Sequence, residues 1–171
     1  MAKIELFNNQ PYMWGWEETI KGKRWTFIET GPAVCVIPLR NRKKGKDNLE
    51  LLLIQEKRSK KTQLKAVGQY LRGLKPAEAA TQALLEEAGV TTQQLSVLCP
   101  KMVGFDVIHL PITLFLGYGW DVVKEGTAQN IIIELEQAVE KVLNNEIGDQ
   151  AAVDAILLIY VLHRRNRLPY L

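Results

Sequence analysis

The sequence predicts an α/β protein in which helices cover both faces of a central sheet, with a small antiparallel β unit at the N-terminus. Two patterns lead to this prediction. Apolar runs rich in β-branched residues, typical of buried strands, recur between residues 34 and 133. Three segments with helical spacing or helix-end signals lie among and after these runs, and helices arranged in this way cover a sheet on both sides.

The first segment, to about Ile28, is rich in aromatic and turn-forming residues. It contains Trp14, Trp16 and Trp25, and Lys21-Gly22-Lys23 is typical of a tight turn. We therefore expect a separate β-rich extension at residues 1–28, followed by the main domain at residues 29–171. The tryptophans of this extension are interpreted as packing or interface anchors, because buried indole rings contribute large contact areas.

The main domain begins with two β-rich apolar runs, Val34 to Leu39 and Leu49 to Gln55, joined by a polar segment. They predict a hairpin with a solvated loop at residues 40–48. Pro111 indicates an edge strand or a bulge where it occurs, because proline cannot donate to a ladder. Further strands are expected at Gln94 to Cys99, Val107 to Leu116 and Ile131 to Ile133.

Three helices are expected. The first runs from about Pro76 to Ala88, since proline suits a first helical turn and Gly89 can adopt the left-handed conformation that ends a helix. The second, Glu134 to Asn144, carries apolar residues at helical spacing. Asp149 is a suitable cap for the third, which continues to about Arg164.

Composition restricts the class of protein. The chain has 171 residues, 47% of them hydrophobic, which suffices for one sizeable core. A net charge of +3 does not indicate a polyanion, and the basic clusters lack interleaved aromatics, so no nucleic-acid partner is expected. Cys35 and Cys99 have no metal-binding or disulfide pattern and are interpreted as small buried residues in a reducing compartment.

The sequence also indicates a location. The N-terminus has no basic segment followed by an apolar one, which argues against secretion. The longest apolar run, Ala155 to Leu162, is much shorter than the ~20 residues that cross a bilayer. We expect a cytoplasmic protein with no membrane segment.

The strongest candidate for chemistry is the end of the first helix, where Glu86 and Glu87 follow one another. About 100° of rotation per residue turns Leu84 and Leu85 toward a core and brings the two acids near the loop at Gly68. Adjacent carboxylates that converge with phosphate oxygens are a usual Mg²⁺ site. The alternative is that the pair belongs to a solvated helix face.

The stretch from Gly68 to Val90 resembles the Nudix box, in which a glycine is followed at fixed intervals by Glu, by Arg-Glu-aliphatic, by Glu-Glu and by Gly-aliphatic. The box is degenerate: the family's first Glu falls on Leu74, its Arg on Gln82, and its helix-leading Glu, usually a metal ligand, on Ala83. The positions that match in register are Gly68, Leu84, Glu86, Glu87, Gly89 and Val90.

Residues 25 to 160 are similar to the ADP-ribose pyrophosphatase branch of the Nudix superfamily. The likeness is carried by Thr30 to Val34, by Leu51 to Arg58 and by Glu146 to Asp149. The Glu-aliphatic-Pro-Ala-Gly of that branch falls on Leu64 to Gly68, and its acidic loop falls on Thr127 to Asn130, which contains no carboxylate. Framework positions match, whereas polar site positions differ.

This resemblance implies a Nudix-type α/β/α sandwich with a mixed sheet. It implies Mg²⁺ or Mn²⁺ bound by Glu86 and Glu87 as the catalytic acids, with Arg58 and Gly68 contacting a nucleoside diphosphate derivative such as ADP-ribose. It also implies a homodimer formed through the N-terminal unit. Glu125 is a possible replacement for the missing ligand.

Three functions follow as alternatives. The chain is an active, metal-dependent pyrophosphatase, although the replaced acids argue for weak or absent activity. It is a nucleotide-binding module that no longer hydrolyses its ligand. Or it is a dimeric interaction protein on a Nudix fold, with a vestigial site.

Overall fold

A computed structural model describes residues 3–9, 13–41, 49–58, 61–103 and 108–168. Within these ranges the chain forms a ten-stranded sheet with the order β1-β2-β3-β9-β4-β5-β10, while β6 pairs with β5, β7 with β4 and β8 with β9. The strands are β1 (Lys3–Asn9), β2 (Met13–Ile20), β3 (Lys23–Thr30), β4 (Ala33–Asn41), β5 (Leu49–Arg58), β6 (Lys61–Lys65), β7 (Val67–Tyr70), β8 (Val90–Val103), β9 (Ile108–Val122) and β10 (Gln129–Glu134).

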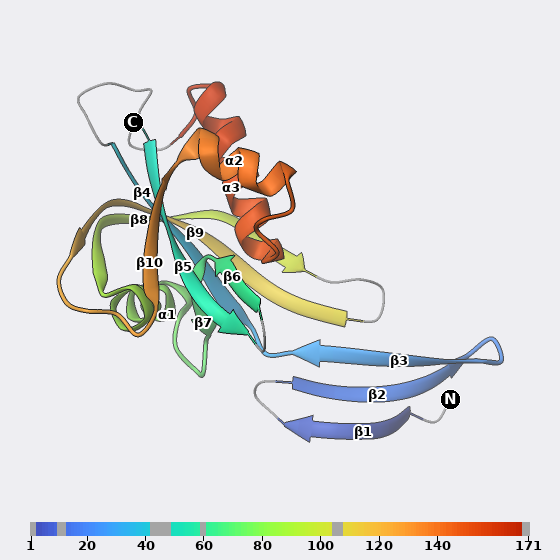
Figure 1. The fold of residues 1–171 in the computed structure, drawn as a ribbon. Helices are drawn as coiled ribbons and strands as arrows, with labels where there is room; N and C mark the ends of the chain where they lie inside the picture. Colours follow the sequence, from blue (N-terminus) through green and yellow to red (C-terminus); the bar gives the residue numbers. More distant parts are fainter. Residues whose placement is uncertain (1–2, 10–12, 42–48, 59–60, 104–107, 169–171) are drawn as a thin grey trace.

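Helices lie on both faces of the sheet (Figure 1), as the sequence predicts. They are α1 (Pro76–Ala83), which continues as a π-helical turn (Leu84–Ala88), then α2 (Leu135–Leu143) and α3 (Gln150–Arg164). Asp149 caps α3 as expected, because its Oδ1 accepts a hydrogen bond of 2.7 Å from the Ala152 N–H. β4 pairs in parallel with β9 and antiparallel with β5, so the sheet is mixed.

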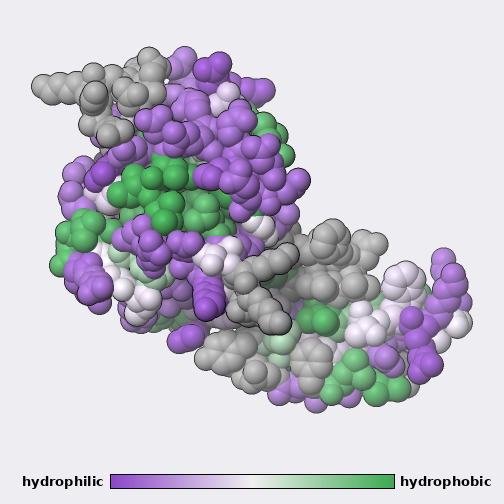
Figure 2. All heavy atoms as spheres, viewed as in Figure 1, coloured by the Kyte–Doolittle hydropathy of each residue, from purple (hydrophilic) through white to green (hydrophobic). Residues whose placement is uncertain are grey.

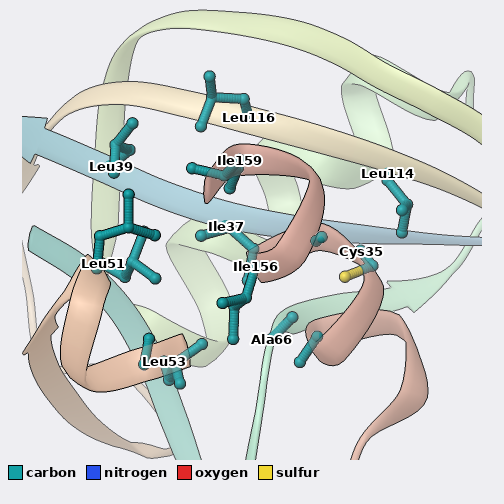
Figure 3. Packing of buried hydrophobic residues seen from close by; sticks show 14 of the residues in the cluster. Cys35, Ile37, Leu39, Leu51, Leu53, Ala66, Leu114, Leu116, Ile156 and Ile159 are labelled. Carbon is teal, nitrogen blue, oxygen red and sulfur yellow. The ribbon is translucent and has the colours of Figure 1, made fainter. Parts of the chain in front are cut away.

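Alternating side chains of β4 and β5 build two separate cores. One core contains Ile37 and Leu53 and packs against α2 and α3 (Figure 3). The other contains Val36 and Leu52 and packs against α1 and the π-helical turn. Successive side chains of a strand point to opposite faces, and here both faces are covered. This explains the continuous apolar runs at residues 33–39 of β4 and 51–54 of β5.

The N-terminal strands form the expected antiparallel unit, which projects from one end of the body (Figure 1). Lys21 and Gly22 make the predicted turn, and both have positive φ angles, 50° and 77°, as hairpin turns of two residues require. The unit joins the main sheet where Ile28 and Glu29 of β3 pair with β9. The predicted boundary between residues 28 and 29 falls inside β3, which ends at Thr30. The division into two domains stays a prediction.

Several elements differ from the sequence prediction. The helix predicted from Pro76 to Ala88 is not α-helical throughout, because its last turn is a π-helix. Leu85, predicted to face the core, is 36% exposed. The strands β6 and β7 were not predicted, because each is short and is defined by pairing with a distant strand. The hairpin between β4 and β5 is confirmed. Its loop, predicted at residues 40–48, begins later, because Arg40 and Asn41 belong to β4; residues 42–48 lie outside the described ranges.

Pro111 lies neither at an edge strand nor at a bulge. It pairs with Met102 of β8 on one side. On its other side β9 changes partner, since Ile108 and His109 pair with β3 and pairing with β4 starts at Ile112. The missing N–H of proline is tolerated at this changeover because no registered partner on that side would need it.

Among the described residues, no helix has both the length and the hydropathy needed to cross a membrane.

Two glycines with positive φ angles give a test of the packing around the helix end. A Cβ at Gly89 (φ 67°) would lie 2.1 Å from the Lys124 carbonyl oxygen, whereas a Cβ at Gly73 (φ 85°) has no heavy atom within 4 Å. Gly73→Ala should therefore lower the free energy of unfolding by about 1–2 kcal/mol, the usual cost of a left-handed alanine. Gly89→Ala should lower it by roughly 2 kcal/mol more, because backbone must move. Urea unfolding of both variants measures the difference, and equal losses would contradict the close approach.

Candidate functional site

A pocket of about 310 Å³ opens at one end of the main sheet, where β4, β7 and β9 meet the start of α3. Cationic, acidic and aromatic side chains share its wall with apolar ones. The residues that line it are Ala33, Val34, Cys35, Lys65, Ala66, Gly68, Gln69, Tyr70, Arg72, Glu87, Leu110, Ile112, Asp149 and Ala151.

Glu87 is the member of the predicted acid pair that reaches this pocket. Its Oε2 accepts a hydrogen bond of 3.0 Å from the Gly68 backbone N–H. Its Oε1 lies 3.4 Å from the Lys65 Nζ, which donates to it. Both carboxylate oxygens therefore have donors, and these come from two different strands. A carboxylate held at both oxygens has one orientation, with its negative charge directed at the Lys65 ammonium.

Gly68 makes this arrangement possible because it has no side chain. It pairs with Cys35 of β4, and a Cβ at this position would lie 2.4 Å from the Val34 carbonyl oxygen. Only glycine allows β7 to approach β4 so closely without displacing backbone. The sequence predicted Gly68 as a substrate-binding position, and that role stays a prediction. In the structure the Gly68 N–H donates a hydrogen bond to Glu87.

Glu86 does not converge with Glu87 on the pocket. It is exposed, it is not among the lining residues, and its Oε1 accepts a hydrogen bond of 2.8 Å from the Gln82 Nε2. Successive residues of an α-helix point about 100° apart, so a single cavity receives only one of two adjacent acids. The predicted catalytic and metal-binding roles of the two acids stay predictions, but only Glu87 faces the cavity.

The loop that aligns with the family's acidic loop caps the end of this helix. The Thr127 and Ala128 N–H groups donate to the Glu86 and Glu87 carbonyls at 3.0 and 2.9 Å. The Asn130 side chain donates to the Ala88 carbonyl at 2.8 Å. These carbonyls would otherwise be orphan acceptors at a helix C-terminus. Residues 127–130 therefore contribute hydrogen-bond donors to the framework.

Two of the positions that differ from the Nudix box pattern, Gln82 and Ala83, have structural contacts. Ala83 is completely buried in the core beneath α1. Gln82 bridges two neighbours, because it donates to Glu86 and its Oε1 lies 3.4 Å from the Gln69 Nε2. Leu74 is 37% exposed. A carboxylate at position 83 would enter an apolar environment, which is costly without a partner.

Two further predicted residues lie away from the described pocket wall. Arg58 is the last residue of β5, and its side chain lies outside the described part of the structure. Its predicted role in substrate binding is therefore not tested. Glu125 is exposed and is not among the lining residues.

Cys35 lies in the wall of the pocket and is 4% exposed. Burial raises the pKa of its thiol above the ordinary value, and the negative charges of Asp149 and Asp154 raise that pKa further, while Lys65 opposes them. The thiol is consequently protonated at neutral pH and is a poor nucleophile. This agrees with the interpretation of Cys35 as a small buried residue.

The residues present do not fit a divalent metal ion. Glu87 already faces an ammonium group, and Glu86 points away from the cavity. No group of three or more His, Cys, Asp or Glu side chains within the described ranges is arranged to hold a metal. Mg²⁺ is usually bound by one or two carboxylates together with waters and substrate phosphates, and a neighbouring ammonium repels it. The Mg²⁺ or Mn²⁺ implied by the family resemblance therefore lacks a suitable donor set in this arrangement.

Sequence reasoning missed Lys65, Tyr70 and Arg72, which contribute two positive charges and an aromatic ring to the pocket. In the sequence Lys65 is one position of the segment Leu64 to Gly68, with no local pattern that predicts a binding role. A signal for it exists in the sequence, because a strand at Lys61–Lys65 antiparallel to β5 brings Lys65 close to Glu56. That signal becomes visible only once β6 is recognised.

Comparison with known proteins supports the fold. A solved structure described as the crystal structure of an ADP compounds hydrolase matches this chain with a TM-score of 0.67. The match covers 98% of each chain at 16% sequence identity. The Nudix-type α/β/α fold class predicted from the resemblance is thereby confirmed. A scan against protein-family models and a search of the curated proteins gave no match.

The unequal environments of the two acids predict unequal effects on stability. Glu87→Gln should lower the free energy of unfolding by about 1–2 kcal/mol, because it removes a charge-assisted contact with the largely buried Lys65. Glu86→Gln is the matched control and should change it by less than about 0.5 kcal/mol, since its only change is on the exposed face. Urea unfolding at pH 7 and low salt measures both, and a larger loss for Glu86→Gln would contradict the geometry.

Proposed function

We propose that this chain binds a nucleoside diphosphate derivative in the pocket beside β7 and does not hydrolyse it by a metal-dependent route. The observation that carries the proposal is the state of Glu87, the acid that faces the cavity. Its carboxylate is engaged by the Lys65 ammonium and by the Gly68 N–H. In this pocket a protein cation, the Lys65 ammonium, lies where a metal ion would have to contact Glu87.

The lining supports a ligand with negative charge and a flat aromatic group. Arg72 brings positive charge to the wall, and Tyr70 offers a ring on which a base can stack. The negative charge of Glu87 faces Lys65, and that of Asp149 lies at the N-terminus of α3, where the helix dipole compensates it. The volume of about 310 Å³ is at the lower end of the range for small-molecule sites.

The fold match supports the class of ligand without deciding the reaction. The matched structure is described as an ADP compounds hydrolase, and one fold commonly carries several activities. Hydrolysis of a diphosphate needs metal-bound oxygens to stabilise charge and activate water. Position 83, where the Nudix box has a glutamate, is a buried alanine, and residues 127–130 cap the helix end. Neither place supplies such a ligand.

Nucleotide binding without turnover gives the test. In EDTA, ADP-ribose at one hundred times its Kd should stabilise the folded chain by about 2.7 kcal/mol, which appears as a higher Tm. Arg72→Gln should weaken binding about tenfold by calorimetry, because it removes a lining cation, while Arg24→Gln in the N-terminal unit is the control and should leave it unchanged.

Two results would contradict the proposal. The first is the absence of any Tm shift with millimolar ADP-ribose or related dinucleotides. The second is release of monophosphates in Mg²⁺ or Mn²⁺, seen by chromatography and abolished by Glu87→Gln, which would establish the active hydrolase instead.

A second function is supported by the N-terminal unit, which we propose pairs with a second copy of the chain. Its register places Trp16 opposite Phe27, and their rings stack with centroids 5.5 Å apart. Trp14 and Trp25 lie two residues from these on the same strands, so all four aromatic side chains share one face. Hydrophobic side chains are visible on the surface of this unit (Figure 2). Trp25 is 43% exposed, while the Lys3 Nζ lies 3.6 Å from the centre of the Trp16 ring. A projecting sheet with exposed aromatic rings is typical of an interface.

Light scattering tests this pairing. The chain should be a dimer at micromolar concentration, and Trp25→Glu should convert it to a monomer because a charge enters the aromatic face. Trp14→Ala and Trp16→Ala should weaken the dimer less severely. Ile4→Glu is the matched control: Ile4 is 58% exposed and opposite Glu17, on the other face of the unit. A monomeric wild-type chain, or loss of the dimer only in Ile4→Glu, would contradict the assignment.

A further inference from the structure

The Lys65 ammonium lies between two carboxylates that come from different layers of the fold. Its Nζ is 3.5 Å from Glu56 Oε2 in β5 and 3.4 Å from Glu87 Oε1 in the π-helical turn. The Lys65 side chain is 14% exposed, whereas the Glu56 and Glu87 side chains are 39% and 26% exposed. The cation is therefore the most enclosed member of the group.

Backbone pairing fixes each of the three groups. Lys65 ends β6 and pairs with Ile54 of β5, so it shares a sheet face with Glu56, two residues further along β5. Glu87 is held at its second oxygen by the Gly68 N–H, which does not move independently of β4. The distance between the two carboxylates and the ammonium is thus set by the sheet and by the helix end.

Two carboxylates around one central cation are the arrangement that proteins use for divalent ions. Here the centre is a lysine side chain attached to the protein itself. A divalent ion entering between the two acids would meet the ammonium at a few ångströms and would have to displace it from both partners. Electrostatic repulsion at such a distance is large in a partly buried site.

We propose that Lys65 is the resident cation of this site and that it excludes divalent metal ions from Glu56 and Glu87. The lysine offsets one of the two negative charges in the absence of any ion. Whether a divalent ion can bind is then decided by one side chain of β6, outside α1 and the π-helical turn. This inference concerns the cation alone and is tested without nucleotide, so its outcome is independent of the proposed binding function.

The test uses Mn²⁺ alone, titrated into the full chain at pH 7 and followed by the electron paramagnetic resonance signal of the free ion. Lys65→Met should create one Mn²⁺ site at least about tenfold tighter than anything in the wild-type chain, and Lys65→Met/Glu87→Gln should lose it. Lys65→Arg keeps the charge and should behave like the wild type. Lys141→Met is the control, because it removes a lysine from an ion pair with a single glutamate, Glu146. This pair is distant from Lys65 in the sequence.

Either of two results would overturn the proposal: Mn²⁺ binding by Lys65→Met that is no tighter than wild type, or equal tightening in Lys141→Met. Circular dichroism shows whether Lys65→Met is folded. If it is not, the wild type and Glu87→Gln decide the question. Identical Mn²⁺ titrations of these two proteins support exclusion of metal from Glu87, and weaker binding by Glu87→Gln overturns it.

Discussion

The hydrogen bond between the Gly68 N–H and the Glu87 carboxylate connects the helical layer to the sheet, and the pocket depends on this contact. It exists because a glycine allows β7 to lie against β4 where any Cβ would collide with the Val34 carbonyl. The bond fixes one oxygen of Glu87 and leaves the other directed at Lys65. The shape of the pocket and its charge therefore follow from one close backbone approach.

The far side of the same helix end is constrained equally tightly. Gly89 ends the π-helical turn in the left-handed conformation, and its carbonyl accepts hydrogen bonds from the Val123 and Lys124 N–H groups. A Cβ at Gly126 would lie 2.3 Å from the Glu87 carbonyl oxygen, so the loop after β9 packs directly on the turn. With donors from residues 127–130 added, the helix end is enclosed by backbone. The position of Glu87 is consequently a property of the fold.

A shared fold and a changed site are compatible, because different residues determine them. Two of the positions that match the box, Leu84 and Val90, are buried apolar residues of the core beneath α1. Of the positions that differ, Ala83 belongs to that core and Gln82 bonds to a neighbouring side chain, and outside the box Asn130 bonds to the end of the helix. A likeness of fold to an ADP compounds hydrolase thus coexists with a pocket whose acid faces a lysine.

The sequence alone determined the layered architecture. Strands β4 and β5 are predictable because both of their faces are buried at residues 33–39 and 51–54, which makes these segments continuously apolar. The helix α3 is predictable because Asp149 caps a helix of apolar spacing. Glu87 and Gly68 were also identified from local pattern. The short strands β6 and β7, the π-helical turn and the divergence of Glu86 were decided by tertiary structure, because pairing with β5 and β4 and packing of residues 122–130 act across long sequence separations. The position of the Lys65 ammonium between Glu56 and Glu87 was also decided by tertiary structure. These three residues meet only when the sheet and the helix end are assembled.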